Sequence, residues 1–418
     1  MATAFSNALS GLQANSQAIN VVSGNLANEN TYGYKANTVS FEELVSEIGG
    51  SATTNLSGGS VVPISSQSFS QGSITTTGQS YDAAIQGNGF FVVQNAGGQQ
   101  AFTRAGNFTL DATGHLLTQS GENVEGWNGV NGVVNTNSPL ADIVLPVAGL
   151  RAPTTTTEFS LNLNLNAGAA VGTTDATFSS PMQVVDSQGQ LHTLTVTYTE
   201  TAPGTWNYDV TIPSADIAGG VGATTDLTPG GGSLTFDANG NLLTPAAGAP
   251  VALTVAGLAD GAADMPLTWN LYDANGNPQI TQYDQASANL ASSQNGTQAG
   301  QLTSMSIGDN GQITAVYSNG DNVAVAQLAV GTVLNPQSMQ DLGSNTFGVT
   351  SATAVPAIGT PGTGSRGTVT GGALEASTVD IATEFTNLLI YERGYQANSK
   401  VITTEDQVIQ TTLGLITA

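Results

Sequence analysis

The sequence predicts a mainly β fold with long terminal α-helices, in which two nested β-rich domains stand on a coiled-coil-like helical base formed by both chain ends. Three observations lead to this fold class. Apolar residues near each end recur every three or four positions, an aspartate-and-glycine hairpin pattern recurs in the middle, and glycine is abundant at 51 residues. A chain of 418 residues can bury two or three separate cores.

The first helix is predicted from Phe5 to Leu26. Its apolar seam steps by three and four residues, with Asn15 as an interruption, through Phe5, Ala8, Leu12, Ile19, Val22 and Leu26. A seam this narrow is typical of coiled coils. The helix is expected to end where Asn28, Asn30 and Gly33 crowd together, because these residues tolerate the left-handed backbone that ends helices.

The second helix is predicted from a capping-box pattern, Ser377 to Asp380, through to the C-terminus. Its spacing runs through Ile381, Phe385, Leu388, Glu392, Tyr395, Ser399, Ile402, Asp406, Ile409, Leu413 and Ile416. A helix of this span is about 57 Å long, well beyond an ordinary globular helix. Three polar residues interrupt this seam, and Gly394 inside the helix costs about 1 kcal/mol relative to alanine.

The middle of the chain is predicted to consist of β-strands joined by tight turns. The segment 108–117 (FTLDATGHLL) is echoed at 234–243 (LTFDANGNLL), and weaker copies lie at 184–189 and 271–276. Each places an aspartate and a glycine at turn positions between β-prone runs, as hairpin loops of three to five residues require.

Composition indicates the domain boundaries. We expect residues 1–30 and 373–418 to form a helical polymerisation layer, 31–75 a linker, 76–147 and 285–365 an inner β domain, and 148–284 an outer β domain. The expected linker is rich in Ser, Gly and Thr. If both ends meet in one layer, the chain must run out to the outer domain and come back.

Charge and cysteine content exclude several functions. Six basic residues stand against thirty acidic ones, for a formal net charge of −24, and no basic residue lies between Arg151 and Arg366. Nucleic acid and anionic lipid are therefore not expected as partners, because both are bound by clustered Lys and Arg. The absence of cysteine rules out disulfides and thiolate sites. The N-terminus lacks the features of a cleaved signal peptide, so any export is expected to use another route.

Two segments, 237–241 and 273–277, match the first three ligand positions of a calcium loop. Such loops also need glycine at the sixth position and glutamate at the twelfth, but Leu242 and Pro278 occupy the sixth positions and no glutamate follows at the right distance. Tight turns are therefore favoured over calcium sites at both places. The Gly87-Asn88-Gly89 sequence is likewise predicted to be a turn.

No catalytic constellation emerges from the sequence. His115 and His192 each stand without a second ligand at metal spacing and are expected to be surface strand residues. Neither a nucleophile elbow nor a Ser–His–Asp set stands out. A carboxylate pair for glycoside hydrolysis stays formally open among thirty acids, although no motif supports it. We therefore expect no enzymatic activity, metal or cofactor.

The terminal helices are instead expected to mediate assembly. An amphipathic helix ordinarily covers the core of its own domain, but these seams are narrow and interrupted by polar residues, so one pair of helices buries little apolar surface. Such helices become stable when many copies pack together. The predicted subunit interface comprises Phe5, Leu12, Ile19, Val22, Leu26, Ile381, Phe385, Leu388, Tyr395, Ile402, Ile409 and Leu413.

Several segments resemble the flagellar rod and hook axial protein family. They are residues 10–35 (SGLQANSQAINVVSGNLANENTYGYK), 71–74 (QGSI), 82–93 (DAAIQGNGFFVV), 102–108 (FTRAGNF), 374–380 (LEASTVD) and 395–398 (YQAN). Within them, the family motif is carried by Asn25, Asn28, Thr31, Gly33, Gly87, Gly89, Phe90 and Phe91. Residues 79–82 (QSYD) depart from the family pattern, which more often shows an Asn-x-Leu-Asp type of segment. The middle, from about 146 to 284, carries no recognised motif.

The resemblance implies a helical homopolymer in which the terminal helices line a central channel and the β domains stack outside. It implies unfolded export through the flagellar type III apparatus, and contacts with the distal rod protein, the hook cap protein and the hook-filament junction proteins. The long middle favours a hook subunit, in the extracellular hook and basal body, over a distal rod subunit. A secreted β-rich adhesin is a further alternative, although an adhesin needs no matched terminal seams.

Overall fold

The computed structural model describes residues 2–44, 60–95, 97–147 and 149–416. The chain forms two compact units. The first comprises Met1–Val147, Ser304–Ala315 and Asn322–Ala418, and the second comprises Ala148–Thr303 and Val316–Asp321. Among the described residues, no helix is both long enough and apolar enough to cross a membrane.

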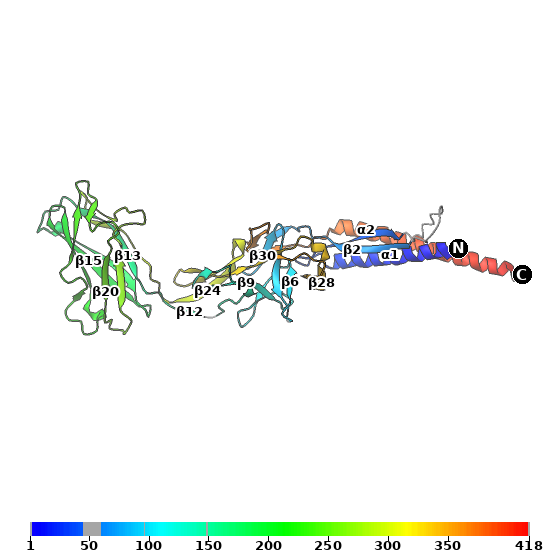
Figure 1. Ribbon diagram of the computed structural model, residues 1–418, viewed down its shortest axis with the longest axis horizontal. Helices are drawn as coiled ribbons and strands as arrows, with labels where there is room; N and C mark the ends of the chain where they lie inside the picture. The colour runs from blue at the N-terminus through cyan, green and yellow to red at the C-terminus, as the bar shows by residue number, and fades with distance from the viewer. Residues whose placement is uncertain (1, 45–59, 96, 148, 417–418) are drawn as a thin grey trace. The chain divides into compact units, whose positions relative to one another are not determined.

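Two long helices begin and end the first unit, α1 (Ala2–Ala27) and α2 (Ile381–Ile416). They lie side by side in antiparallel directions, and α2 continues past the N-terminal end of α1 (Figure 1). The prediction of a helix at each chain end is therefore confirmed. Between them, the described part of the chain contains only short 3₁₀ turns as helices, η1 (Thr174–Ala176), η2 (Ser214–Asp216), η3 (Asp309–Gly311) and η4 (Pro336–Ser338).

A two-stranded hairpin packs along the helices. Strand β1 (Asn37–Leu44) pairs antiparallel with β2 (Ser60–Gln67), and both contact α1. This hairpin corrects the expected linker at 31–75, of which residues 45–59 lie outside the described residues. In β1, Val39 and Phe41 alternate with polar residues, a period of two that suits a strand with one covered face. We call α1, α2 and this hairpin the helical base.

The inner sheet of the first unit follows the strand order β26-β9-β5-β6-β29-β28. Its strands are β5 (Phe90–Gln94), β6 (Gln100–Thr103), β9 (Asn123–Val130), β26 (Asn322–Leu328), β28 (Gln340–Gly343) and β29 (Thr346–Gly348). Shorter strands pair at its margins, namely β7 (Thr109–Leu110), β8 (Leu116–Leu117), β10 (Val133–Val134), β11 (Ala141–Asp142), β27 (Val330–Thr332) and β30 (Ala357–Gly359). Buried aromatic residues, among them Phe90, Phe102 and Phe347, form its core.

The returning chain pairs with the outgoing chain next to the helical base. Strand β3 (Ile74–Thr76) pairs with β32 (Ala373–Glu375), and β4 (Ala83–Gln86) pairs with β31 (Thr368–Gly371). Because β32 leads into α2, this pairing brings α2 back beside α1. Strands β24 (Gly300–Ile307) and β25 (Gln312–Tyr317) each contain one of the points where the chain passes from one unit to the other.

The second unit is built from two sheets. One contains β13 (Glu158–Asn166), β20 (Val251–Val255), β21 (Met265–Trp269), β22 (Ile280–Tyr283) and β23 (Ala288–Gln294). The other contains β14 (Thr177–Val185), β15 (Leu191–Ala202), β16 (Thr205–Pro213), β17 (Thr224–Asp226), β18 (Gly232–Phe236) and β19 (Leu242–Thr244). Strand β12 (Leu150–Arg151) pairs with the start of β24.

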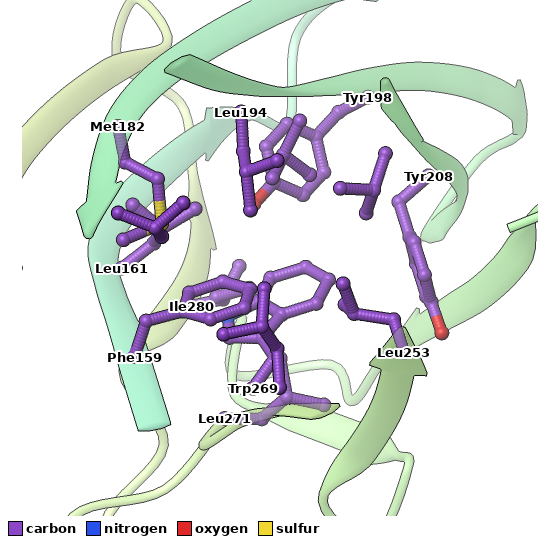
Figure 2. Packing of buried hydrophobic residues seen from close by; sticks show 14 of the residues in the cluster. Phe159, Leu161, Met182, Leu194, Tyr198, Tyr208, Leu253, Trp269, Leu271 and Ile280 are labelled. Carbon is purple, nitrogen blue, oxygen red and sulfur yellow. The ribbon is translucent and has the colours of Figure 1, made fainter. Parts of the chain in front are cut away.

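A single core of apolar side chains from both sheets fills this unit (Figure 2). Buried and partly exposed residues alternate along β16, as they should in a strand with one face on a core. Trp269 lies in the middle of an aromatic group, stacked on Phe159 with ring centroids 5.8 Å apart and edge-on to Tyr208 at 5.1 Å. Residues 285–303 also belong to this unit, because β23 pairs with β13, whereas we expected them in the inner domain.

The predicted hairpin turns are confirmed, and they share one hydrogen-bond pattern. At Asp237, Oδ1 accepts from the backbone N–H of Asn239 and of Asn241, while Gly240 adopts a left-handed φ of 78°. The same contacts recur at the turns that begin with Asp111, Asp186 and Asp273. The aspartates of the two calcium-like segments therefore hold their own backbone amides.

The two histidines differ in their surroundings. His115 is half-buried beside Asp111, with its Nδ1 2.8 Å from Thr113 Oγ1. His192 is only 1% exposed, which corrects the expectation that it is a surface strand residue. The reason is that the carboxylates of Asp186, six residues earlier, and Asp216, 24 residues later, pair with His192 and compensate for its burial.

Candidate polymerisation site: the helical base

The contact between α1 and α2 is made through small residues and amides. A Cβ added to Gly11 would lie 2.8 Å from Asn398 Nδ2, and one added to Gly394 would lie 2.6 Å from Asn15 Oδ1. The arrangement is reciprocal, because Asn15 Nδ2 donates to Gly11 O at 2.7 Å and Asn398 Nδ2 donates to Gly394 O at 2.9 Å. Each glycine thus makes room for an asparagine of the other helix, which explains why Gly394 occurs inside α2.

The buried stripe of α1 coincides only in part with the predicted seam, with which it shares Ala8 and Val22. Its fully buried apolar residues are Ala8, Ala14, Ala18 and Val22. Of the predicted interface residues, Val22 belongs to this stripe, Leu12, Ile19 and Leu26 are half-buried, and Phe5 is 43% exposed. The predicted seam consists mostly of large side chains, whereas the two helices contact each other mostly through small ones.

Most of the described side chains among the predicted interface residues of α2 are exposed in the single chain. Leu388 and Ile402 are half-buried, whereas Ile381, Phe385, Tyr395 and Ile409 are exposed. The side chain of Leu413 lies outside the described ones. The observed contact with the rest of the base runs instead through Glu384, Tyr391, Gly394 and Asn398.

Exposed apolar side chains occupy more than one face of α2. One face carries Ile381, Phe385 and Leu389, which follow one another at steps of four residues. Another face carries Ile390, Val401 and Val408, which are separated by nearly whole numbers of helical turns. Phe385, Leu389 and Ile390 are 53%, 56% and 58% exposed. A helix that is apolar on several faces needs cover on several sides, and α1 with the hairpin covers only one region of it.

The start of α2 corrects the predicted capping box. Asp380, not Ser377, is the N-cap residue, because its Oδ1 accepts from the Thr383 N–H at 2.8 Å and the helix begins at Ile381. Ser377 Oγ accepts from the Val379 N–H at 3.3 Å in the approach to the helix. Thr378 Oγ1 accepts from the Ala36 N–H at 2.9 Å, so this segment is also tied to the chain that leaves α1.

The Asn25 side chain connects several elements at the end of the base that faces the inner sheet. Its Nδ2 donates to Glu384 Oε1 at 2.9 Å and to Asn37 O at 2.7 Å, and its Oδ1 accepts from the Asn37 N–H and from Tyr34 Oη. Asn25 is completely buried, and one side chain therefore joins α1, α2 and β1. Burial raises the pKa of Glu384, and the hydrogen bond from Asn25 opposes that rise.

The hairpin also packs on α2 through aromatic side chains. The ring of Phe41 in β1 meets the ring of Tyr391 edge-on, with centroids 5.8 Å apart. The hairpin is not fully covered on either face, because Phe41 and Ile64 keep 42% and 41% of their surface exposed.

A buried group of three charges joins the base to the inner sheet. Lys35 Nζ donates to Glu375 Oε1 at 2.6 Å, and Arg104 Nη1 donates to Glu375 Oε2 at 3.1 Å. The three side chains are at most 4% exposed. Burial lowers the pKa of Lys35 and of Arg104, and in both cases Glu375 opposes the shift. We call Lys35, Arg104 and Glu375 the junction cluster.

Backbone groups complete the junction cluster. Lys35 Nζ also donates to Ser70 O at 2.6 Å, Arg104 Nη2 donates to Gly87 O at 2.7 Å, and the Gly72 N–H donates to Glu375 Oε1 at 2.7 Å. Sequence reasoning did not single out these charges. A signal existed, because two of only six basic residues fall inside the quoted motif segments.

Four family models match the chain in succession. They are described as the flagella basal body rod protein (residues 5–35), the flagellar hook protein FlgE/F/G D1 domain (84–164), the flagellar basal body protein FlaE D2 domain (162–297) and the flagellar basal body rod FlgEFG protein C-terminal (370–415). The flagellar hook protein FlgE of Escherichia coli K12 is 32% identical over 99% of this chain and 100% of its own length. The chain belongs to the flagellar hook protein family. FlgE of Treponema pallidum, 31% identical over 97% of this chain and 98% of its own length, is a further similar protein.

The fold agrees with membership of the hook protein family. The crystal structure of Helicobacter pylori flagellar hook protein FlgE2 superposes with a TM-score of 0.53 at 15% identity. The match covers 71% of this chain and 99% of that chain.

The motif residues of this hook family protein lie at the junction between helical base and inner sheet. Gly33 has a left-handed φ of 70°, and a Cβ added to it would lie only 2.5 Å from Ala105 N. Asn28 Oδ1 accepts from Thr31 Oγ1, which shapes the end of α1. Gly87 and Gly89 form the predicted turn between β4 and β5, with φ of 97° and 127°. Phe90 and Phe91 follow this turn and are buried.

Proposed function

We propose that this chain is the structural subunit of the bacterial flagellar hook. In this proposal it polymerises helically into a curved, flexible tube that couples rod to filament and transmits torque. The observation that carries the proposal is the distribution of apolar side chains on α2, which leaves Phe385, Leu389 and Ile390 exposed on different faces. Copies of the same helix packed around it would cover those faces.

The way in which α1 and α2 contact each other supports assembly of subunits through the large side chains of the base. The contact inside one chain uses glycine, alanine and asparagine, so most large apolar residues remain available to neighbours. We therefore keep most of the predicted subunit interface as part of this proposal. The residues kept are Phe5, Leu12, Ile19, Leu26, Ile381, Phe385, Leu388, Tyr395, Ile402 and Ile409. To these we add Leu389, Ile390, Val401 and Val408, which sequence spacing did not select.

Partners and location follow as part of the same proposal. The subunit would meet the distal rod protein at one end of the tube, and the hook cap and hook-filament junction proteins at the other. It would leave the cell through the flagellar type III export apparatus. We propose no enzymatic role, since a structural subunit accounts for the exposed apolar helix.

The test compares two exposed apolar residues changed to aspartate in the purified full-length chain. Leu389→Asp is expected to abolish tube formation seen by electron microscopy, because each subunit would bury an unpaired carboxylate in the helical layer. Val221→Asp, an equal change at an 89% exposed loop residue of the second unit, is expected to leave tubes intact. Normal tubes from Leu389→Asp would refute the proposed interface, and straight tubes from the wild type would favour a rod subunit.

A further inference from the structure

The second unit contains a side-chain cluster that assembly through the helical base does not explain. His192 in β15 faces three carboxylates. Its Nε2 lies 3.2 Å from Asp186 Oδ2 and 3.7 Å from Asp260 Oδ2, and its Nδ1 lies 3.2 Å from Asp216 Oδ2. The side chains of His192 and Asp186 are at most 1% exposed, and that of Asp260 is 18% exposed.

The carboxylates are held in place by backbone amides. Asp186 Oδ1 accepts from the N–H groups of Gln188 and Gln190, which leaves Oδ2 directed at the imidazole. Asp260 Oδ1 accepts from the Ala262 N–H at 2.9 Å, which leaves its Oδ2 for the same site. Neither carboxylate needs to rotate to present an oxygen to a bound ion.

The distances fit three ligands around one metal ion. One ligand atom from each of Asp186, His192 and Asp260 lies within 4.8 Å of the other two. Ligands at about 2.0 to 2.4 Å from a common ion are separated by such distances. Asp216 occupies the position of the outer carboxylate that usually fixes the tautomer of a metal-bound histidine through its other nitrogen.

The charge of the region also favours a bound cation. No lysine or arginine lies between Arg151 and Arg366, so His192 is the only side chain of residues 152–303 that can carry positive charge. Carboxylates this close together repel one another unless a proton or a metal ion lies between them.

The cluster lies where three segments of the second unit meet. Gln188 Nε2 donates to Asp260 O at 3.3 Å, the Ala263 N–H donates to Ser187 Oγ at 3.0 Å, and the Ala259 N–H donates to Asp216 O at 2.9 Å. These contacts join the turn after β14, the η2 segment and the loop between β20 and β21. An ion bound here would join the turn after β14 directly to the loop between β20 and β21, and would be linked to the η2 segment through His192 and Asp216.

We propose that Asp186, His192 and Asp260 bind one divalent transition-metal ion of the Zn²⁺ class, with Asp216 orienting the imidazole. A nitrogen ligand beside two carboxylates suits Zn²⁺ better than Mg²⁺ or Ca²⁺, which prefer oxygen ligands. The ion joins the turn after β14 to the loop between β20 and β21 and leaves at least one coordination position for water. The site belongs to the second unit and does not depend on the proposed hook function.

Titration of the full-length chain with ZnCl₂ alone, followed by isothermal calorimetry, tests the site. The wild type is expected to bind one Zn²⁺, and Asp186→Asn to lose that binding. Asp273→Asn is the matched control, because Asp273 caps an identical turn but does not face His192. In both variants the asparagine can still accept from the backbone amides, so the turn is retained. No Zn²⁺ binding by the wild type, or equal binding by the two variants, would overturn the site.

Further variants separate ligation from folding. Asp216→Asn keeps all three ligands and is expected to weaken Zn²⁺ binding by about 10- to 100-fold. His192→Gln is expected to lose binding and His115→Gln to keep it. If His192→Gln fails to fold by circular dichroism, Asp260→Asn, in a surface loop, replaces it with the same expected loss. Tighter binding of Ca²⁺ than of Zn²⁺ in a parallel titration would contradict the assigned metal class.

Discussion

At the scale of single residues, the junction cluster joins the two chain ends to the inner sheet. Lys35 follows α1, Glu375 precedes α2, and Arg104 directly follows β6. The ion pair of Lys35 and Glu375 spans 340 positions of sequence. Buried pairs of this kind are costly to break, because the partner that remains is an uncompensated buried charge.

We therefore predict that Glu375→Gln destabilises the first unit by about 3 to 5 kcal/mol, since it leaves two buried cations without their carboxylate. Hydrogen exchange followed by mass spectrometry measures this in β3 and β32, and the second unit is an internal reference. Glu392→Gln, which changes an exposed acid of α2, should leave exchange in β32 unaltered. Equal effects of the two variants would contradict a structural role for the cluster.

A pH dependence is predicted at Glu384. Because burial raises its pKa, the folded base binds this proton more tightly than the unfolded chain. Stability contributed by the protonated form is therefore present at acidic pH and is lost as pH rises through the raised pKa. Glu384→Gln should flatten the dependence of helix unfolding on pH, followed by circular dichroism. An unchanged pH profile would show that Glu384 is not the responsible group.

Some of these residues could be predicted from the sequence, and others could not. The aspartates of the hairpin turns could be predicted, because their partners lie two and four positions away. Asn25 was identified as a motif residue, but its partner Glu384 is 359 positions away, and no local pattern indicates such a contact. The burial of His192 escaped prediction for the same reason, since Asp216 and Asp260 follow it at long distances.

At the scale of elements, α1 and α2 form an antiparallel pair that is close because its contact residues are small. The three-four spacing predicted both helices but not their mutual orientation. Large residues dominate a hydrophobic pattern, so most of the contact stripe of glycine, alanine and asparagine was not recognised as a contact. The β1–β2 hairpin was missed because its second strand lies in a segment rich in Ser, Gly and Thr, and a single pair of strands gives a weak alternating signal.

Identical substitutions at two glycines of α1 test this helix contact. Gly24→Ala should stabilise the base by up to about 1 kcal/mol, because alanine is the better helix former and no atom lies within 4 Å of its added Cβ. Gly11→Ala should be less stable than Gly24→Ala by about 1 to 3 kcal/mol, because its Cβ would press on Asn398. Thermal unfolding followed by helical circular dichroism measures both. Equal stabilisation by the two changes would show that Gly11 makes no close contact.

At the scale of the whole molecule, the sequence predicted a chain that goes out from a helical base and comes back to it. The pairing of β3 with β32 and of β4 with β31 brings the returning chain to the outgoing one within the first unit. The two-sheet arrangement of the second unit could not be predicted, because strand order depends on contacts such as β13 with β23, far apart in the chain. Family membership agrees with a subunit whose ends assemble.

Helix α2 is exposed in the single chain and, in the proposed polymer, is covered by neighbouring subunits. Because the protein has no cysteine, Leu389→Cys and Val221→Cys each introduce one thiol at an exposed position. Maleimide labelling of both variants should be rapid in the monomer. In assembled tubes, labelling of Leu389→Cys should be lost while that of Val221→Cys persists, and equally rapid labelling of Leu389→Cys in monomer and tube would contradict the claim.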